Sequence, residues 1–198
     1  MIFSILGIKF EISVPFAVIL SFLLVTDGTG LMTASLSAVV AHEAGHLIAM
    51  KLSGCAPQSV KLGAGGVLMI GSAFCTAKEN IIIALSGPFV NLLLTALLWT
   101  AGSLANNLLL LAFAAVQFLV GAVNLLPVKG LDGGTVLRFL LLRLPKCNVE
   151  LVMKFVSVFT ALLITVVGLA VAVKNVSNPS LLLLGIYLII INIYRYNY

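Results

Sequence analysis

The chain has 198 residues, of which 62% are apolar and only 9% are charged. Soluble domains carry about 25% charged residues, so this composition excludes a water-soluble protein. The formal net charge of +5 comes from scattered basic residues, and this scatter favours a role in membrane topology over a nucleic-acid site.

Several apolar stretches approach or exceed the roughly 18 residues that cross a membrane. They predict an all-α polytopic membrane protein with about six transmembrane helices. We expect a single domain over residues 1–198, because no polar segment is long enough to fold separately outside the bilayer. A short strand is predicted over residues 2–12, where polar and apolar residues partly alternate. The predicted spans are residues 12–26, 33–52, 80–100, 107–124, 151–173 and 180–194.

The basic residues are distributed asymmetrically around these spans. With the N-terminus in the cytoplasm, every Lys and Arg except Lys174 falls on the cytoplasmic side. This bias predicts a multi-pass protein of the cell membrane with both termini in the cytoplasm. Cys55, Cys75 and Cys147 fall on the same side and lack CxxC spacing, so we expect reduced thiols without a function.

The second predicted span contains the only two histidines of the chain, in the segment His42-Glu43-Ala44-Gly45-His46. Residues four apart project from one face of a helix, so both imidazoles can bind one metal ion near the cytoplasmic end of the span. Glu43 is next to them, and its carboxylate can act as general base toward a metal-activated water. Ionisable groups in a span cost roughly 2.5–3.5 kcal/mol each and seldom persist without function. The segment therefore predicts a zinc site that hydrolyses its substrate.

Residues 58–75 differ from the apolar spans. Four glycines, at positions 63, 65, 66 and 71, argue against a stable helix, and the β-branched and aromatic residues between them favour a hairpin. Exposed backbone cannot face lipid tails, so such a hairpin is expected to be membrane-associated, at the interface or lining a cavity. A plain cytoplasmic connector fits this composition equally well.

The third span contains Ser86-Gly87-Pro88, followed by Asn91. Proline kinks a helix, whereas serine and glycine permit close approach of a neighbouring helix. We expect Asn91 to turn inward and to serve packing rather than chemistry.

A catalytic zinc ion usually has three protein ligands, so two histidines leave one position to fill. Among the six acidic residues, Asp132 alone lies in a glycine-framed loop at the predicted depth of the histidines. It is the best candidate for the third ligand of one Zn²⁺ ion. Asn124, before this loop, is a candidate to donate to the substrate carbonyl or to hold the substrate backbone. A short amphipathic helix is predicted after the loop, over residues 135–144.

Three segments occur in the order seen in site-2 proteases, the intramembrane zinc metalloproteases. They are His42-Glu43-Ala44-Gly45-His46, Ser86-Gly87-Pro88 with Asn91, and Asn124-x-x-Pro127-x-x-x-x-Asp132-Gly133. The resemblance covers roughly residues 1–140, and residues 145–198 supply two further predicted spans. It implies zinc ligation by His42, His46 and Asp132, base catalysis by Glu43, and substrate positioning by Asn124.

The resemblance also implies that the hairpin around Gly65 and Gly66 offers an edge strand to an unwound substrate. The chain looks most like the compact branch of bacterial sporulation proteases without a PDZ or CBS domain, although Lys129-Gly130 and Thr135 depart from the pattern of many relatives. The implied substrate is a membrane-tethered protein cut within or near its transmembrane segment to release a cytoplasmic fragment. Candidates are a sigma-factor precursor or an anti-sigma factor; the expected partners are the lipid bilayer and a membrane-embedded regulator, not nucleic acid.

Two alternatives compete with a protease. An ion or metal transporter favours charged groups spread over several helices, whereas here they gather around one helix and one loop. A catalytically inactive homologue is expected to lack Glu43 or a metal ligand, and neither is missing.

Overall fold

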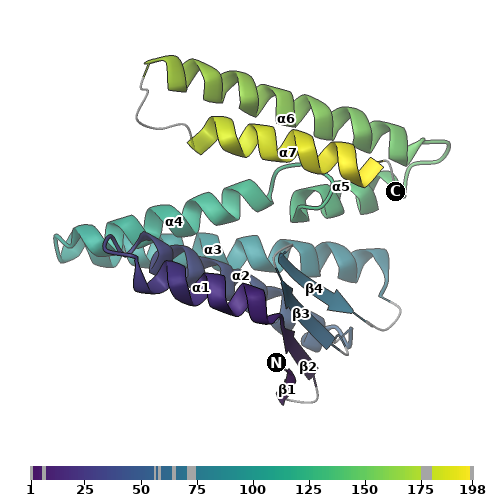
Figure 1. Ribbon diagram of the computed structural model, residues 1–198. Coiled ribbons are helices and arrows are strands. Elements are labelled where there is room, and N and C mark those ends of the chain that lie inside the picture. The colour runs from purple at the N-terminus through teal and green to yellow at the C-terminus, as the bar shows by residue number, and fades with distance from the viewer. Residues whose placement is uncertain are drawn as a thin grey trace. The chain divides into compact units, whose positions relative to one another are not determined.

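The computed structural model describes residues 2–5, 8–55, 57, 59–63, 66–70, 75–174 and 180–196. The described part is mostly helical, with seven helices and four strands (Figure 1). The chain divides into two compact units, residues 1–122 and 123–198, and each is described by itself. The expectation of a single domain stays a prediction.

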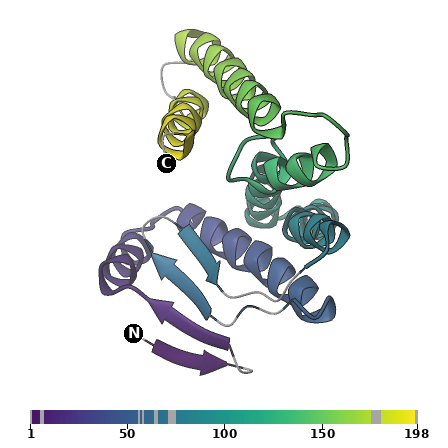
Figure 2. The same cartoon turned by 90° about the vertical axis from the view of Figure 1, so that its right-hand side faces the viewer.

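The first unit contains a four-stranded sheet, in the order β1-β2-β3-β4 (Figure 2). β1 pairs antiparallel with β2, β2 pairs parallel with β3, and β3 pairs antiparallel with β4. A 3.0 Å ion pair between Lys61 Nζ and Glu11 Oε2 joins the two central strands on their exposed side. The strands are β1 (Ile2–Ile5), β2 (Ile8–Ile12), β3 (Ser59–Gly63) and β4 (Gly66–Ile70).

The hairpin predicted within residues 58–75 is confirmed by the pairing of β3 with β4. Two related expectations were wrong. Residues 2–12 form two strands instead of one, and the hairpin is part of a larger sheet. Local alternation cannot reveal the parallel pairing of β2 with β3, because the two strands are separated by two helices in the sequence.

Four helices accompany the sheet, and α2 and α3 pack closely against each other. At Gly45 of α2, an added Cβ would lie 2.8 Å from the backbone oxygen of Ser86 in α3. Only a residue without a side chain permits this approach, which brings the histidine-bearing face of α2 against α3. The helices are α1 (Val14–Val25), α2 (Leu31–Leu52), α3 (Ala77–Leu104) and α4 (Leu108–Asn124).

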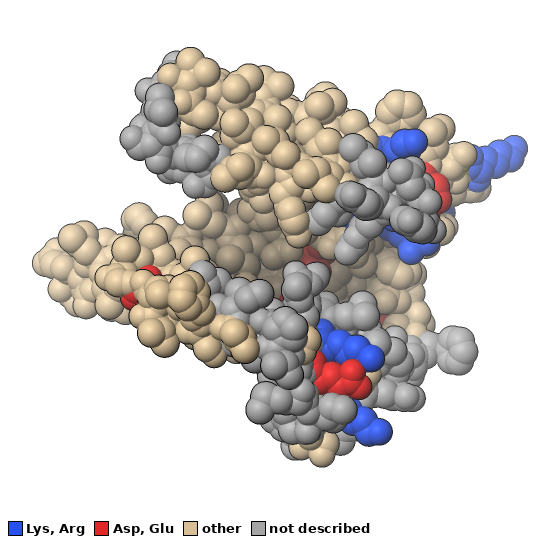
Figure 3. All heavy atoms as spheres, viewed as in Figure 1, with Lys and Arg blue, Asp and Glu red and all other residues tan. Residues whose placement is uncertain are grey.

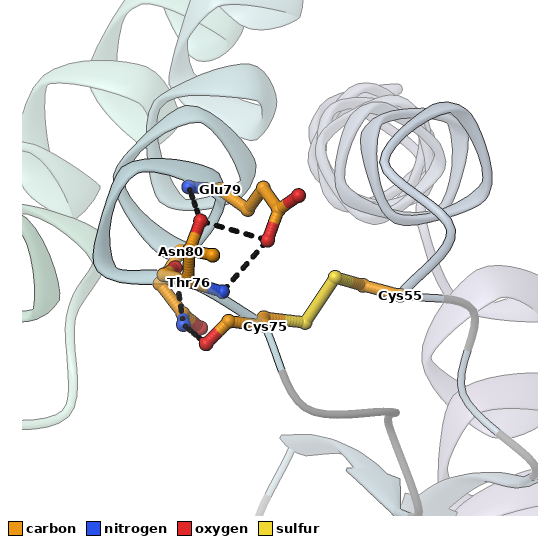
Figure 4. Close-up of a disulfide and its surroundings, with 5 residues drawn as sticks. All are labelled: Cys55, Cys75, Thr76, Glu79 and Asn80. Atoms are coloured by element: carbon orange, nitrogen blue, oxygen red, sulfur yellow. Dashed lines mark hydrogen bonds between the residues drawn. A yellow bond between two sulfur atoms is a disulfide. The ribbon is translucent and has the colours of Figure 1, made fainter.

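A disulfide between Cys55 and Cys75 connects the end of α2 to the start of α3 (Figure 4). Next to it, Thr76 and Glu79 form a capping box at the first turn of α3. The expectation of reduced thiols was therefore wrong for these two cysteines. The fold brings their Cα atoms to 6.0 Å, although they lie 20 residues apart in sequence. Cys147 is a free thiol.

The second unit is built around a helical hairpin of α6 and α7. Its buried core contains Val128, Ala161 and Leu188. At Gly168 of α6 an added Cβ would lie 2.5 Å from the backbone nitrogen of Leu182, so the two helices are in near backbone contact. The short helix expected over residues 135–144 is present as α5, with bounds three residues earlier. The helices are α5 (Asp132–Leu141), α6 (Val149–Lys174) and α7 (Ser180–Tyr196).

Each of the six predicted spans falls on a helix, but the helices differ in length. In the described residues, two helices, α3 and α6, are long and apolar enough to cross a membrane. α4 and residues Leu181–Ile190 of α7 are apolar but shorter. Large apolar side chains on the helix surfaces, such as Phe89 and Phe155, are exposed. On the face seen in Figure 3, charged side chains gather over the sheet and over one end of α6, and the helix surfaces are largely uncharged.

Candidate metal centre

His42 and His46 lie on the same face of α2, and both are buried. Their ring centroids are 4.7 Å apart, with the ring planes nearly perpendicular, at 88°. The two Nε2 atoms face each other at 3.1 Å. The prediction that residues four apart would bring both imidazoles together is confirmed.

The Nδ1 atom of His46 is held by α3. It lies 2.7 Å from the backbone oxygen of Ile83, which also accepts a 2.6 Å hydrogen bond from the Ser86 hydroxyl. A carbonyl oxygen can only accept, so Nδ1 of His46 must carry the proton. In a neutral imidazole the proton-free nitrogen is then Nε2, the atom that faces His42.

The Nδ1 atom of His42 is held by a buried pair of amides. It lies 2.7 Å from Oδ1 of Asn91. The amide nitrogen of Asn91 donates to the backbone oxygen of Ala38 at 3.0 Å and to Oε1 of Gln117 at 2.6 Å. Asn91 is fully buried and Gln117 is 3% exposed. The expectation that Asn91 turns inward to find a partner is confirmed, and the partner includes the His42 ring.

Gln117 was missed by sequence reasoning. The signal that could have found it is a glutamine in the middle of α4, an otherwise apolar helix. A polar side chain in such a helix needs a partner, and Asn91 is that partner here.

The two histidines fit a metal ion. Two nitrogen ligands of a tetrahedral zinc ion, each about 2.0–2.1 Å from the metal, are about 3.3 Å apart, close to the observed 3.1 Å. Gly87 of α3 borders the two rings, because a Cβ there would lie 2.5 Å from Nε2 of His46 and 2.9 Å from Cε1 of His42.

The other predicted site residues lie in different elements. Glu43 follows His42 in α2 and is partly buried. Asn124 ends α4 and Asp132 begins α5, both beyond residue 122 and so in the second unit. Their assembly with the histidines stays a prediction. Gly66 begins β4, and Gly65 lies outside the described residues.

The fold matches that of the site-2 protease from Methanocaldococcus jannaschii with a TM-score of 0.60, covering 95% of this chain and 91% of that protein. The sequences are 20% identical over this match. The chain has the site-2 protease fold. The fold that the sequence resemblance implies is thereby confirmed.

The sequence is also similar to proteins that are named as zinc metalloproteases. The protein named "Putative zinc metalloprotease Rip3" of Mycobacterium tuberculosis is 35% identical over 128 residues, which cover 59% of this chain and 32% of the relative. A zinc metalloprotease of Methanocaldococcus jannaschii is 28% identical over 156 residues, which cover 71% of this chain and 44% of the relative. The chain thus spans less than half the length of these relatives. No protein-family model matches it.

Proposed function

We propose that this protein is a zinc metalloprotease that hydrolyses a peptide bond within or near a transmembrane segment of its substrate. The observation that carries the proposal is the pair of His42 and His46 Nε2 atoms, which face each other at 3.1 Å in an apolar helix, with the Glu43 carboxylate next to them in sequence. The match to a site-2 protease fold and the names of the sequence relatives support it.

The proposed zinc ligands are His42, His46 and Asp132. Two imidazoles and one carboxylate form a donor set typical of catalytic zinc, which keeps its fourth position open. When bound, zinc supplies Lewis-acid polarisation of the scissile carbonyl and lowers the pKa of the attacking water toward about 7. Glu43 takes the proton of that water and passes it to the leaving amine. Asn124 holds the substrate backbone or donates to the carbonyl oxygen.

A transmembrane helix must be unwound before its backbone can be cut. We assign this task to the sheet, because β4 is an edge strand in the described sheet order and can add an extended peptide through backbone hydrogen bonds. Gly66, together with Gly65, gives the substrate close access to this backbone. The proposed substrate is a membrane-tethered protein, such as a sigma-factor precursor or an anti-sigma factor, which releases a cytoplasmic fragment.

The test compares Glu43→Gln with the wild type. Each form is co-expressed with single-span membrane proteins of the same genome, and fragment release is scored together with the zinc content of the purified protein. We expect Glu43→Gln to keep about one zinc ion per chain and to lose cleavage. Glu150→Gln is the matched control, since its carboxylate is 58% exposed on α6, and it should cleave normally.

Two outcomes would contradict the proposal. Cleavage that survives in Glu43→Gln would remove the assigned base. A wild-type protein that binds no zinc would remove the metalloprotease as a whole.

A further inference from the structure

We propose that Asn91 and Gln117 are positioning residues that hold His42 in the tautomer whose Nε2 carries no proton and can therefore bind metal. The inference rests on the proposed function for its purpose, but its evidence is a hydrogen-bond chain within the first unit. This chain runs from α4 through α3 to α2, and every side chain in it is buried.

The hydrogen bonds of this chain have a fixed donor-to-acceptor direction, because one of its ends is a backbone oxygen. The backbone oxygen of Ala38 can only accept, so the atom of Asn91 that lies 3.0 Å from it is the amide nitrogen. The carbonyl oxygen of the same amide must then point to His42. There it accepts a proton from Nδ1 at 2.7 Å, which leaves Nε2 of His42 without one.

Gln117 strengthens this orientation. Its Oε1 accepts the second hydrogen of the Asn91 amide at 2.6 Å, so both hydrogens of that amide are used. Rotating the Asn91 amide by 180° would leave the Ala38 oxygen and Oε1 of Gln117 facing an oxygen. In a buried, low-dielectric site an unsatisfied polar group is costly, so the observed orientation is strongly preferred.

Close helix packing makes the short Gln117 contact reachable. At Gly121, one turn after Gln117 on α4, an added Cβ would lie 3.1 Å from Cβ of Asn91 and 3.4 Å from the backbone oxygen of Pro88. α4 therefore approaches α3 closely enough for an amide to bridge them. This close contact joins Gln117 and Gly121 of α4 to Pro88 and Asn91 of α3.

The two metal-binding rings are thus oriented in different ways. His46 is held by a backbone oxygen, which no side-chain substitution removes. His42 depends on a side chain, which substitution can remove. The inference therefore predicts a selective effect on one of the two rings.

The experiment uses the full-length protein in detergent, labelled with ¹⁵N-histidine, without metal and at a pH where both rings are neutral. Only two histidines are present, so four ring-nitrogen signals report the tautomer of each ring. We expect wild-type His42 to be protonated at Nδ1. Asn91→Leu removes the acceptor at similar volume, and it should move much of the His42 population to the other tautomer while leaving His46 unchanged.

Zinc affinity, measured by competition with a chelator, is the second readout. We expect Asn91→Leu to weaken zinc binding by about 10–100-fold, as is typical for loss of a partner that orients a ligand. Asn91→Asp keeps an acceptor for Nδ1 but loses the donor to the Ala38 oxygen, so this variant should keep the His42 tautomer and lose less zinc affinity than Asn91→Leu. Asn192→Leu, which replaces a buried asparagine in α7, is the matched control and should leave affinity unchanged.

If Asn91→Leu does not fold, Asn91→Ala replaces it, because alanine also removes the acceptor of the His42 Nδ1 proton and adds no bulk. The inference is overturned if His42 keeps its Nδ1 proton to the wild-type extent in the folded variant that lacks this acceptor. Failure of the proposed function looks different: wild-type protein would not bind zinc, yet the ¹⁵N signals would still show Asn91-dependent positioning of His42.

Discussion

Gly87 lies against the edge of the His46 ring that faces His42, where a Cβ would come within 2.5 Å of Nε2. The same Cβ would lie 2.9 Å from His42 Cε1, so a single backbone position on α3 limits the space around both rings. The lack of a side chain at Gly87 therefore leaves the space that the two rings occupy.

From this contact we expect Gly87→Ala to weaken zinc binding about tenfold or more, because the added methyl group displaces the rings from their shared geometry. Chelator competition measures the change. Gly28→Ala is the control, since a Cβ at Gly28 meets nothing within 4 Å. A zinc affinity equal to that of the wild type would show that α3 and the two rings can move apart to accommodate the methyl group.

Gly45→Ala tests the packing of α2 against α3. Its Cβ would lie 2.8 Å from the backbone oxygen of Ser86, which can move only if a helix moves. Overpacking costs about 1–3 kcal/mol, and the higher helix propensity of alanine offsets up to about 1 kcal/mol of this. We expect lower stability against denaturant. Val40→Ala, at a 59% exposed position on the same helix, should change little, and a Gly45 variant as stable as this control would refute the close contact.

Loss of the disulfide should destabilise the first unit. Cys55 and Cys75 enclose a loop of 20 residues by sequence separation, so replacing both with serine is expected to cost about 3 kcal/mol. Cys147→Ser is the control, since that thiol is free. Maleimide labelling without reductant should modify one cysteine per chain in the wild type, and labelling of all three would contradict the bond.

The same labelling bears on topology. Disulfides persist in oxidising compartments, whereas the distribution of basic residues predicts that this end of α2 faces the cytoplasm. Impermeant maleimide applied to intact cells, after reduction with a permeant reagent, reports which side Cys55 and Cys75 face. Labelling of these cysteines from outside would contradict the membrane orientation predicted from the distribution of basic residues.

Asp27 accepts hydrogen bonds from the first turn of α2 and should make stability depend on pH. Its carboxylate accepts hydrogen bonds from Thr29, Met32 and Thr33. Partial loss of solvent tends to raise the pKa of Asp27, but these hydrogen bonds outweigh it and hold the pKa below its ordinary value of 3.8. The stabilisation is thus complete above that value and is lost as the pH falls through the folded-state pKa.

Comparison with Asp27→Asn isolates this contribution. The wild type should be the more stable form at neutral pH, and the difference should shrink toward zero in acid. Thermal unfolding of both forms across the acid range measures it. A difference that stays constant with pH would show that the charge of Asp27 does not take part.

The sequence by itself determined the helices, the pairing of the two histidines and the family resemblance, whereas it left a hairpin and a plain connector equally open for residues 58–75. These features depend on short-range spacing: four residues return to one face of a helix, and apolar length marks a span. A pattern that repeats over a few residues can be read without knowing the fold.

Only the tertiary structure decided which distant groups meet. It pairs β2 with β3, joins Cys55 to Cys75, and places Asn91 between His42 and Gln117. Such contacts depend on how closely helices and strands approach, and Gly45, Gly87 and Gly121 set that distance by lacking a side chain. A glycine looks the same in sequence whether it lies in a loop or at a helix contact, so only the packed fold distinguishes the two.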